Sequence, residues 1–66
     1  MNIPTYHKTL NAIIELAKIN KTGTPIELSA KLSISERTLR RMLNDIRLME
    51  INIKYSRKEQ TYKIFK

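Results

Sequence analysis

Apolar residues in the N-terminal part of the chain recur at helical spacing, starting with Tyr6. Five of them fall at i, i+4, i+7, i+8 and i+11, which places them on one stripe of an amphipathic helix. They are Tyr6, Leu10, Ile13, Ile14 and Ala17. The stripe predicts a first helix over about residues 4–20, and we expect Gly23 to provide the left-handed conformation that caps its C-terminus.

A capping signal opens a second helix. Thr24 is a suitable N-cap, Pro25 suits the first helical position, and Glu27 can complete a capping box. These residues predict a helix over about residues 25–32. Its apolar residues follow the helical period imperfectly, and we expect them to be buried. They are Ile26, Leu28 and Leu32.

A second capping signal opens a third helix, over about residues 36–49. Ser35 is the expected N-cap, and the carboxylate of Glu36 suits the positive end of a helix. Only Ser33 and Ile34 separate this helix from the one before, so the two must cross steeply, as in a helix-turn-helix. One side of the third helix is apolar. It consists of Leu39, Met42, Leu43 and Ile46.

The pattern changes from helical to alternating after Met49. Residues 51–55 and 62–64 alternate apolar and polar, and the intervening residues 56–60 are all polar. This predicts a hairpin, a wing, over about residues 51–65. Its loop contains no Gly, Asn or Asp, which disfavours a tight type I′ turn. Because two strands alone are marginally stable, their apolar side chains should pack on the helices.

Composition agrees with a small ordered domain. The 66 residues are 41% hydrophobic with a single glycine, which favours a globule over a disordered tail. We predict one domain over residues 1–66, mostly α with a small β-hairpin, with the architecture of a three-helix winged helix-turn-helix. There is no cysteine, and no apolar run reaches the roughly 18 residues of a membrane span, so we expect a cytoplasmic protein.

Charge is distributed unevenly along the chain. Thirteen Lys and Arg residues against six Asp and Glu give a net charge of +7. Residues 1–34 hold four lysines and two glutamates, a net of +2, whereas residues 35–66 hold nine basic and four acidic residues, a net of +5, including all five arginines. A basic C-terminal half suits a polyanion partner. The alternative is that this net charge only keeps a small domain soluble.

Residues suited to catalysis are few. His7 is the only histidine, cysteine is absent, and no two of the six acidic residues stand at i, i+3 or i, i+4. A single glycine does not make a phosphate-binding glycine loop. We therefore expect no enzymatic activity, no cofactor and no metal.

Several short segments resemble the winged helix-turn-helix domains of bacterial transcriptional regulators, with DeoR-type regulators and the N-terminal domain of the biotin operon repressor nearest in pattern. The resemblance covers about residues 12–64. The segments that carry it are Leu28–Ser35, Arg37–Arg41, Leu43–Asn44, Ile46–Arg47, Ile51–Ile53 and Thr61–Ile64. It implies binding of double-stranded DNA, with the third helix as the recognition helix.

This chain departs from the family's pattern at three positions. The family commonly has glycine where Ser33, Glu50 and Thr61 stand here. A serine or glutamate with positive φ costs about 1 kcal/mol relative to glycine, which the fold can tolerate.

The side of the third helix opposite its apolar residues carries the best candidates for DNA contact. Arg37, Arg41 and Asn44 stand there, flanked by Arg40 and Thr38. Arginine can bond O6 and N7 of guanine together, and asparagine can bond N6 and N7 of adenine. Because recognition helices read bases with their N-terminal part, we expect base contacts from Arg37, Thr38 and Arg41, with Asn44 next. Arg40 is expected to bind phosphate.

The alternative for this side is a solvated face held by ion pairs. Glu36–Arg40 and Arg41–Asp45 both stand at i, i+4, where each pair contributes only a few tenths of a kcal/mol.

Further candidates lie at the helix starts and in the hairpin. The hydroxyls of Thr24 and Ser35 lie at helix N-termini, where free N–H groups attract phosphate, although each residue serves as a cap in any case. Lys54, Arg57 and Lys58 make the wing basic. The pair at its tip is expected either to reach the DNA backbone or minor groove, or to solubilise the hairpin.

Two apolar residues lie outside the predicted core pattern. Leu48 is off the apolar side of the third helix, and we expect it to pack under the wing or, alternatively, to form a dimer contact. Phe65 is out of phase with Tyr62 and Ile64 and is expected to be exposed or, alternatively, to contact a partner.

The leading hypothesis is a double-stranded DNA-binding module of a sequence-specific transcriptional regulator. A domain this small reads few base pairs, so it would act with a homodimer partner or a further domain. Two alternatives stay open: a winged helix that binds another protein, and an accessory DNA binder of a mobile element. No membrane partner is expected, because tertiary packing explains the amphipathic third helix better than a lipid surface does.

Overall fold

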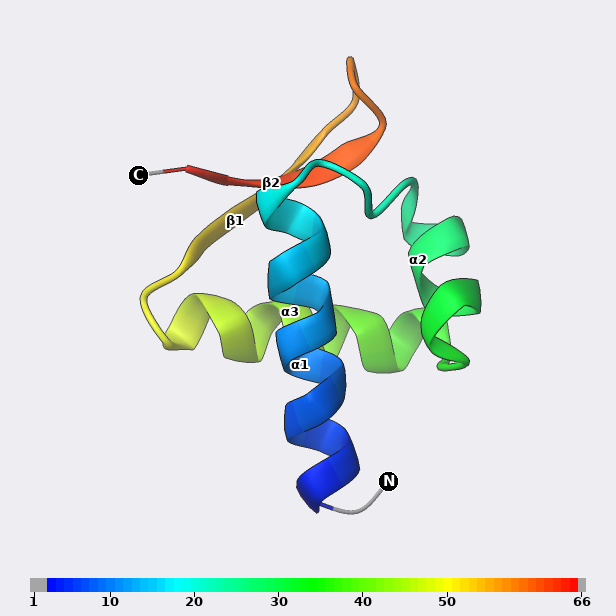
Figure 1. The fold of residues 1–66 in the computed structure, drawn as a ribbon, viewed down its shortest axis with the longest axis vertical. Helices are drawn as coiled ribbons and strands as arrows, with labels where there is room; N and C mark the ends of the chain where they lie inside the picture. The colour runs from blue at the N-terminus through cyan, green and yellow to red at the C-terminus, as the bar shows by residue number, and fades with distance from the viewer. Residues whose placement is uncertain (1–2, 66) are drawn as a thin grey trace.

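Three helices followed by an antiparallel hairpin form the fold, as the apolar pattern predicts. The computed structural model describes residues 3–65. Its elements are α1 (Ile3–Lys18), α2 (Pro25–Leu32), α3 (Glu36–Leu48), β1 (Asn52–Ser56) and β2 (Thr61–Phe65). In Figure 1, α1 crosses α3, α2 lies beside the N-terminal end of α3, and the hairpin lies over the C-terminal end of α1. The domain is compact, mostly α and winged-helix-like.

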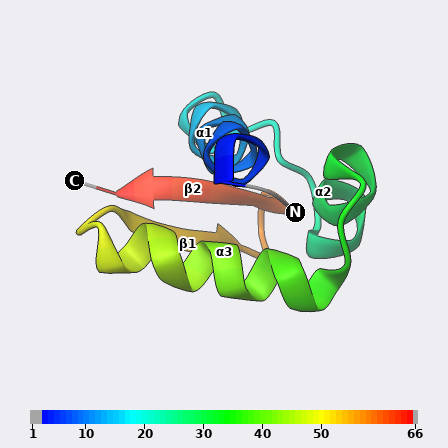
Figure 2. The ribbon, with the colours of Figure 1, turned by 90° about the horizontal axis from the view of Figure 1, so that it is seen from below.

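One apolar core joins all five elements. Figure 2 shows α1 and α3 on either side of the hairpin, with α2 at one end. Helix α1 packs against β2, and α3 packs against β1 and α2. The core contains three residues of the predicted α1 stripe, all four of the α3 stripe and one residue from each remaining element, while Tyr6 and Ile14 pack half-buried against it. Its residues are Leu10, Ile13, Ala17, Leu28, Leu39, Met42, Leu43, Ile46, Ile53 and Tyr62.

Both predicted N-caps are confirmed. The Thr24 hydroxyl accepts the Glu27 N–H at 3.2 Å, and the Glu27 carboxylate accepts the Thr24 N–H at 3.3 Å, which completes the capping box. The Ser35 hydroxyl accepts the Thr38 N–H at 3.1 Å. Helix α2 therefore has its predicted bounds, and α3 ends one residue earlier than predicted.

The C-terminus of α1 differs from the prediction. The helix ends at Lys18, and Asn20 rather than Gly23 is the left-handed residue that closes it, with φ of 57°. The Lys21 N–H donates to the Leu16 carbonyl at 2.9 Å, and the Asn20 N–H donates to the Ala17 carbonyl at 3.2 Å. These two bonds are a Schellman motif. Asparagine tolerates this conformation better than most residues, so the helix closes before it reaches the glycine.

The other two helices end in the same motif, again without glycine. Ser33 closes α2 with φ of 55°, and Glu50 closes α3 with φ of 64°, as the resemblance to the family predicts. The N–H of Ile34 donates to the Ser29 carbonyl at 3.0 Å, and the N–H of Ile51 donates to the Ile46 carbonyl at 3.4 Å. In the wing the left-handed residue is Gln60, with φ of 53°, one position before Thr61.

The prediction that Ile26 is buried is wrong, since its side chain is 68% exposed. Helix α2 has only two turns and buries Leu28, with Leu32 half-buried one turn later. Positions 26 and 28 are about 200° apart on a helix, so a helix with one buried side cannot bury both.

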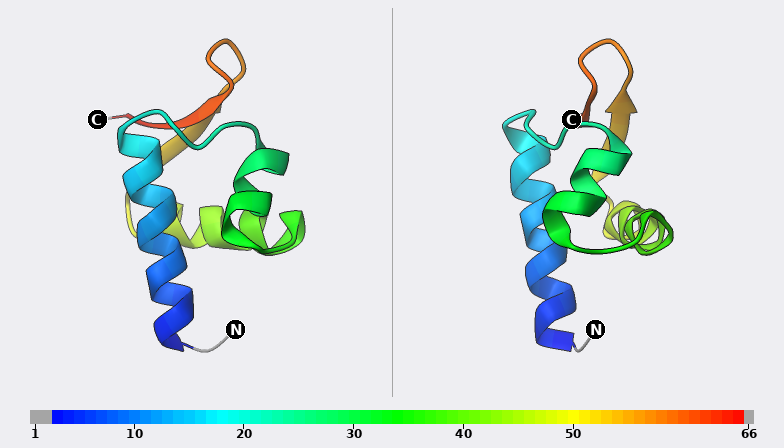
Figure 3. Two further views of the ribbon diagram at one scale, coloured as in Figure 1. Left: turned by 45° about the vertical axis from the view of Figure 1, so that its right-hand side comes forward. Right: turned by 90° about the vertical axis from the view of Figure 1, so that its right-hand side faces the viewer.

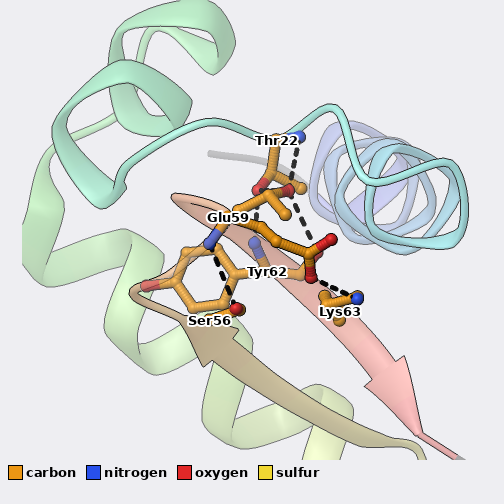
Figure 4. A network of polar contacts seen from close by, with 6 residues as sticks. Thr22, Ser56, Glu59, Tyr62 and Lys63 are labelled. Atoms are coloured by element: carbon orange, nitrogen blue, oxygen red, sulfur yellow. Dashed lines mark hydrogen bonds and ion pairs between the residues drawn. The ribbon is translucent and has the colours of Figure 1, made fainter.

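A buried polar cluster ties the loop between α1 and α2 to β2 (Figure 4). Thr22 is fully buried, and its hydroxyl accepts the Tyr62 N–H at 2.7 Å. The same hydroxyl lies 2.9 Å from the hydroxyl of Thr61, which accepts the Thr22 N–H at 3.2 Å. The cluster joins Thr22 to Thr61 and Tyr62, which lie 39 and 40 positions later in the sequence. It therefore holds the connection to α2 against the hairpin.

We expect Thr22→Val to lower the free energy of unfolding by about 1–3 kcal/mol, because the buried Tyr62 N–H and Thr61 hydroxyl lose a partner. Thr22→Ser keeps the hydroxyl and loses one methyl group, so it should cost only about 1 kcal/mol. Urea denaturation followed by circular dichroism measures both variants. Equal stability of the valine and serine variants would show that the hydrogen bonds contribute little.

We expect Glu50→Gly to be more stable than Glu50→Ala by about 1 kcal/mol, because glycine adopts the positive φ of this position without a Cβ clash. Both variants lose the same charge, so thermal unfolding of the pair isolates the backbone effect. A glycine variant no more stable than the alanine variant would contradict the left-handed conformation at the end of α3.

Candidate nucleic-acid interface

Burial of one side of α3 determines where its other side points. Helix α3 buries its predicted apolar residues against the hairpin, α2 and α1. Figure 2 shows α3 on the side of the molecule opposite α1, so the reverse side of the helix faces solvent there. We call the exposed polar residues of that side the α3 outer face. They are Arg37, Arg40, Arg41 and Asn44.

The side chains of the α3 outer face are unpaired. Within residues 3–65, none of the four has a hydrogen-bond or ion-pair partner. The ion pairs of that part of the chain lie on α1 and in the hairpin. Neither Glu36–Arg40 nor Arg41–Asp45, the pairs of the alternative interpretation, forms there. Three guanidinium groups and one carboxamide therefore keep their full hydrogen-bonding capacity for a partner.

Thr38 occupies a different position from the one expected of a base-contacting residue. It is half-buried, and its hydroxyl accepts a hydrogen bond from the Ser35 hydroxyl at 3.0 Å. Its N–H is bound by the same serine at 3.1 Å. Both side chains thus belong to the cap that starts α3.

The start of α2 is poorly suited to phosphate. The Thr24 hydroxyl donates to the Glu27 carboxylate at 3.0 Å, and that carboxylate also accepts the Thr24 N–H. The capping box therefore places a negative charge where a phosphate would approach, which opposes an anion at this helix end. The structure accounts for Thr24 as a cap.

The wing is a second exposed basic surface, separate from α3. Lys54, Arg57 and Lys58 are all exposed. In Figure 3 the hairpin tip, which carries the last two, stands away from the helices. In the hairpin register Lys54 lies directly opposite Lys63.

The turn at the tip of the hairpin is closed by its own side chains (Figure 4). The Ser56 hydroxyl accepts the Glu59 N–H at 3.3 Å, and the Glu59 carboxylate forms an ion pair with Lys63. The carboxylate thereby neutralises one lysine of the cross-strand pair, which would otherwise be repulsive. Lys54, Arg57 and Lys58 stay without an ion-pair partner in the part of the chain that the structure describes.

Arg47 positions the wing, a role that the sequence analysis did not assign. Its Nε donates to the Ile53 carbonyl at 3.2 Å, which joins α3 to β1. Burial raises the pKa of the Tyr62 phenol, and the positive charges of Arg47 and Arg40 partly oppose that rise. Arg40 and Arg47 stand at i, i+7 and therefore lie on one flank of α3. The sequence offered one signal for this role of Arg47. The connection from α3 to β1 is short, so the strand has to run back past the end of the helix.

Leu48 does not pack under the wing as predicted, because its side chain is 75% exposed. Strand β1 contributes Ile53 to the core next to the buried side of α3, whereas Leu48 lies in line with Arg41 and Asn44 on the other side. Phe65 is 44% exposed, which confirms the expectation from its phase in β2.

The raised pKa of Tyr62 predicts an alkaline loss of stability. The fold favours the neutral phenol, so this contribution is complete below the unfolded pKa of about 10 and is lost as pH rises through the higher folded pKa. Urea denaturation between pH 8 and pH 11 should show a steeper decline for wild type than for Tyr62→Phe. Parallel profiles for the two proteins would contradict the prediction.

Other kinds of site find little support in residues 3–65. In that range no group of three or more His, Asp or Glu side chains is placed to hold a metal ion. None of the helices there has both the length and the apolar character needed to cross a membrane. Comparison with protein-family models, with curated proteins and with solved structures found no match.

Proposed function

We propose that the protein binds double-stranded DNA by inserting α3 into the major groove, as a module of a transcriptional regulator. The observation that carries this proposal is the α3 outer face, with three arginines and an asparagine exposed and unpaired on a helix anchored by its other side. An α-helix with its side chains is about 10–12 Å wide, and the major groove of B-DNA is about 12 Å wide. Duplex RNA fits less well, because its deep, narrow major groove does not admit a helix.

The wider charge distribution supports the same partner. Residues 35–66 carry a net charge of +5. Phosphate neutralisation supplies most of the sequence-independent affinity for DNA. In this arrangement Arg37 and Arg41 approach base edges, Arg40 binds phosphate beside them, and the wing residues Lys54 and Arg57 bind backbone phosphates on the flank. An accessory DNA binder of a mobile element would use the same surface in the same way.

A protein-binding winged helix is the second candidate, and one observation favours it. Leu48 and Met49, at the C-terminal end of α3, are 75% and 55% exposed. Exposed apolar residues next to one another are typical of protein contacts. The unpaired arginines favour DNA, since a protein-binding surface gains little from an uninterrupted positive face.

Arg37→Ala/Arg41→Ala should weaken binding to a labelled mixed-sequence duplex and make its salt dependence shallower. If wild type neutralises about five phosphates, log K should fall with log salt at a slope of about −4 to −5. The double variant should lower the magnitude of this slope by about 1–2. Fluorescence anisotropy between 50 and 200 mM salt measures both quantities, and circular dichroism checks the fold.

The matched control is Lys8→Ala/Lys18→Ala on α1, which removes the same charge from the opposite side of the molecule. It should change affinity and slope much less than the arginine variant. Equal losses in the two variants would mean that only net charge matters. Absence of wild-type binding even at 50 mM salt would reject DNA as the partner and favour the protein-binding alternative.

A further inference from the structure

The spacing of the side chains on the α3 outer face indicates which bases the proposed DNA-binding surface would read. Counted from Arg37, the other members stand at i+3, i+4 and i+7. The helix residues with which homeodomains read the major groove include three at i, i+4 and i+7. At i, i+4 and i+7, Arg37, Arg41 and Asn44 form a row along the helix, and Arg40 lies beside that row.

We propose that α3 selects a duplex site with two guanines and one adenine, read in order by Arg37, Arg41 and Asn44. This inference rests on the proposed DNA-binding function. A guanidinium group can donate to O6 and N7 of guanine at once, and a carboxamide can pair with N6 and N7 of adenine. No acidic or apolar side chain interrupts the row between Arg37 and Asn44, so cytosine amino groups and thymine methyl groups find no matching partner in it.

Helix geometry sets the size of this site. At about 1.5 Å per residue, Arg37 and Arg41 are about 6 Å apart along α3, and Arg41 and Asn44 about 4.5 Å. Base pairs rise by about 3.4 Å, so each step along the row advances about one to two base pairs. The two guanines and the adenine therefore fall within about five base pairs, in the order in which the three side chains follow one another.

Arg40 has a different role in this arrangement. It stands seven positions before Arg47, whose Nε donates to the Ile53 carbonyl, so it lies at the edge of the α3 outer face that is nearer the wing. A side chain beside the row meets the wall of the groove, so Arg40 binds a phosphate and carries no sequence preference. This difference between Arg40 and Arg41, adjacent in sequence and both exposed, makes them a matched pair for an experiment.

The test is selection from a duplex library with a randomised core, at one salt concentration. Wild type should enrich two guanines and an adenine in the order given. Arg37→Ala, Arg41→Ala and Asn44→Ala should each lose the preference at one position only, where wild type discriminates by about 5- to 150-fold. Arg40→Ala should weaken binding to all duplexes alike and leave the selected sequence unchanged.

A modified base makes the contact to guanine directly testable. Replacing one selected guanine with 7-deazaguanine removes the N7 acceptor and keeps Watson–Crick pairing. Wild type should bind the duplex modified at the Arg41 position more weakly than the parent duplex, by at least about fivefold. Arg41→Ala should bind both duplexes equally, whereas Arg40→Ala should discriminate as wild type does.

The outcomes separate this inference from the proposed function. If wild type binds duplexes without base preference, or selects a site that lacks these bases, the inference is wrong and the proposal of duplex binding stands. Variants that lose affinity without any change in preference do the same. Wild type that binds no duplex at low salt overturns both, and the salt series shows this without reference to sequence.

Discussion

The surface chemistry of this domain depends on the burial of four apolar side chains on one side of α3. Leu39, Met42, Leu43 and Ile46 are almost fully removed from water. Each such burial stabilises the fold by about 1.5–3 kcal/mol, so turning α3 about its axis would cost more than a domain this small can lose. The directions of the arginines are consequently settled by core packing and not by contacts of their own. Core packing therefore holds the α3 outer face in a fixed orientation.

The hairpin needs different support, because two strands are not stable alone. Its root is held from both sides: the Thr22 hydroxyl binds the Tyr62 N–H, and Arg47 binds the Ile53 carbonyl. The rings of Tyr55 and Tyr62 also meet edge to face across the strands, with centroids 5.1 Å apart. The tip has only local contacts of its own. The wing therefore has a root fixed by the core and an exposed basic tip.

Local patterns were sufficient for most of the fold. Capping residues and the helical period predicted α2 at its observed bounds and α3 to within one residue, because both signals act over a few positions. The end of α1 was mispredicted because a local signal was ambiguous there. Asn20 and Gly23 both suit a left-handed cap, and only the packing of the following loop distinguishes them. The Thr22–Thr61 cluster spans 39 positions, and nothing in the local pattern marks either threonine.

The same distinction between local patterns and tertiary contacts applies to the candidate site. Exposure of Arg37, Arg41 and Asn44 follows from the helical period alone. The roles of Thr38 and Arg47 depend on which hydrogen bonds their side chains form after folding, so residue type did not reveal them. Leu48 was mispredicted because the path of β1 past α3 is a tertiary feature.

Arg37, Arg40 and Arg41 are unfavourable to the free domain, and this supports a partner independently of their spacing. Arg37 lies in the first turn of α3, where the positive end of the helix dipole disfavours a cation. Arg40 and Arg41 follow at i+3 and i+4, and each like-charged pair costs a few tenths of a kcal/mol. No acidic side chain in the described residues offsets these terms through an ion pair. A bound polyanion removes the repulsion, so binding and folding stabilise each other. Local departures from the stability optimum are expected at functional surfaces, and the α3 outer face is one such departure in this domain.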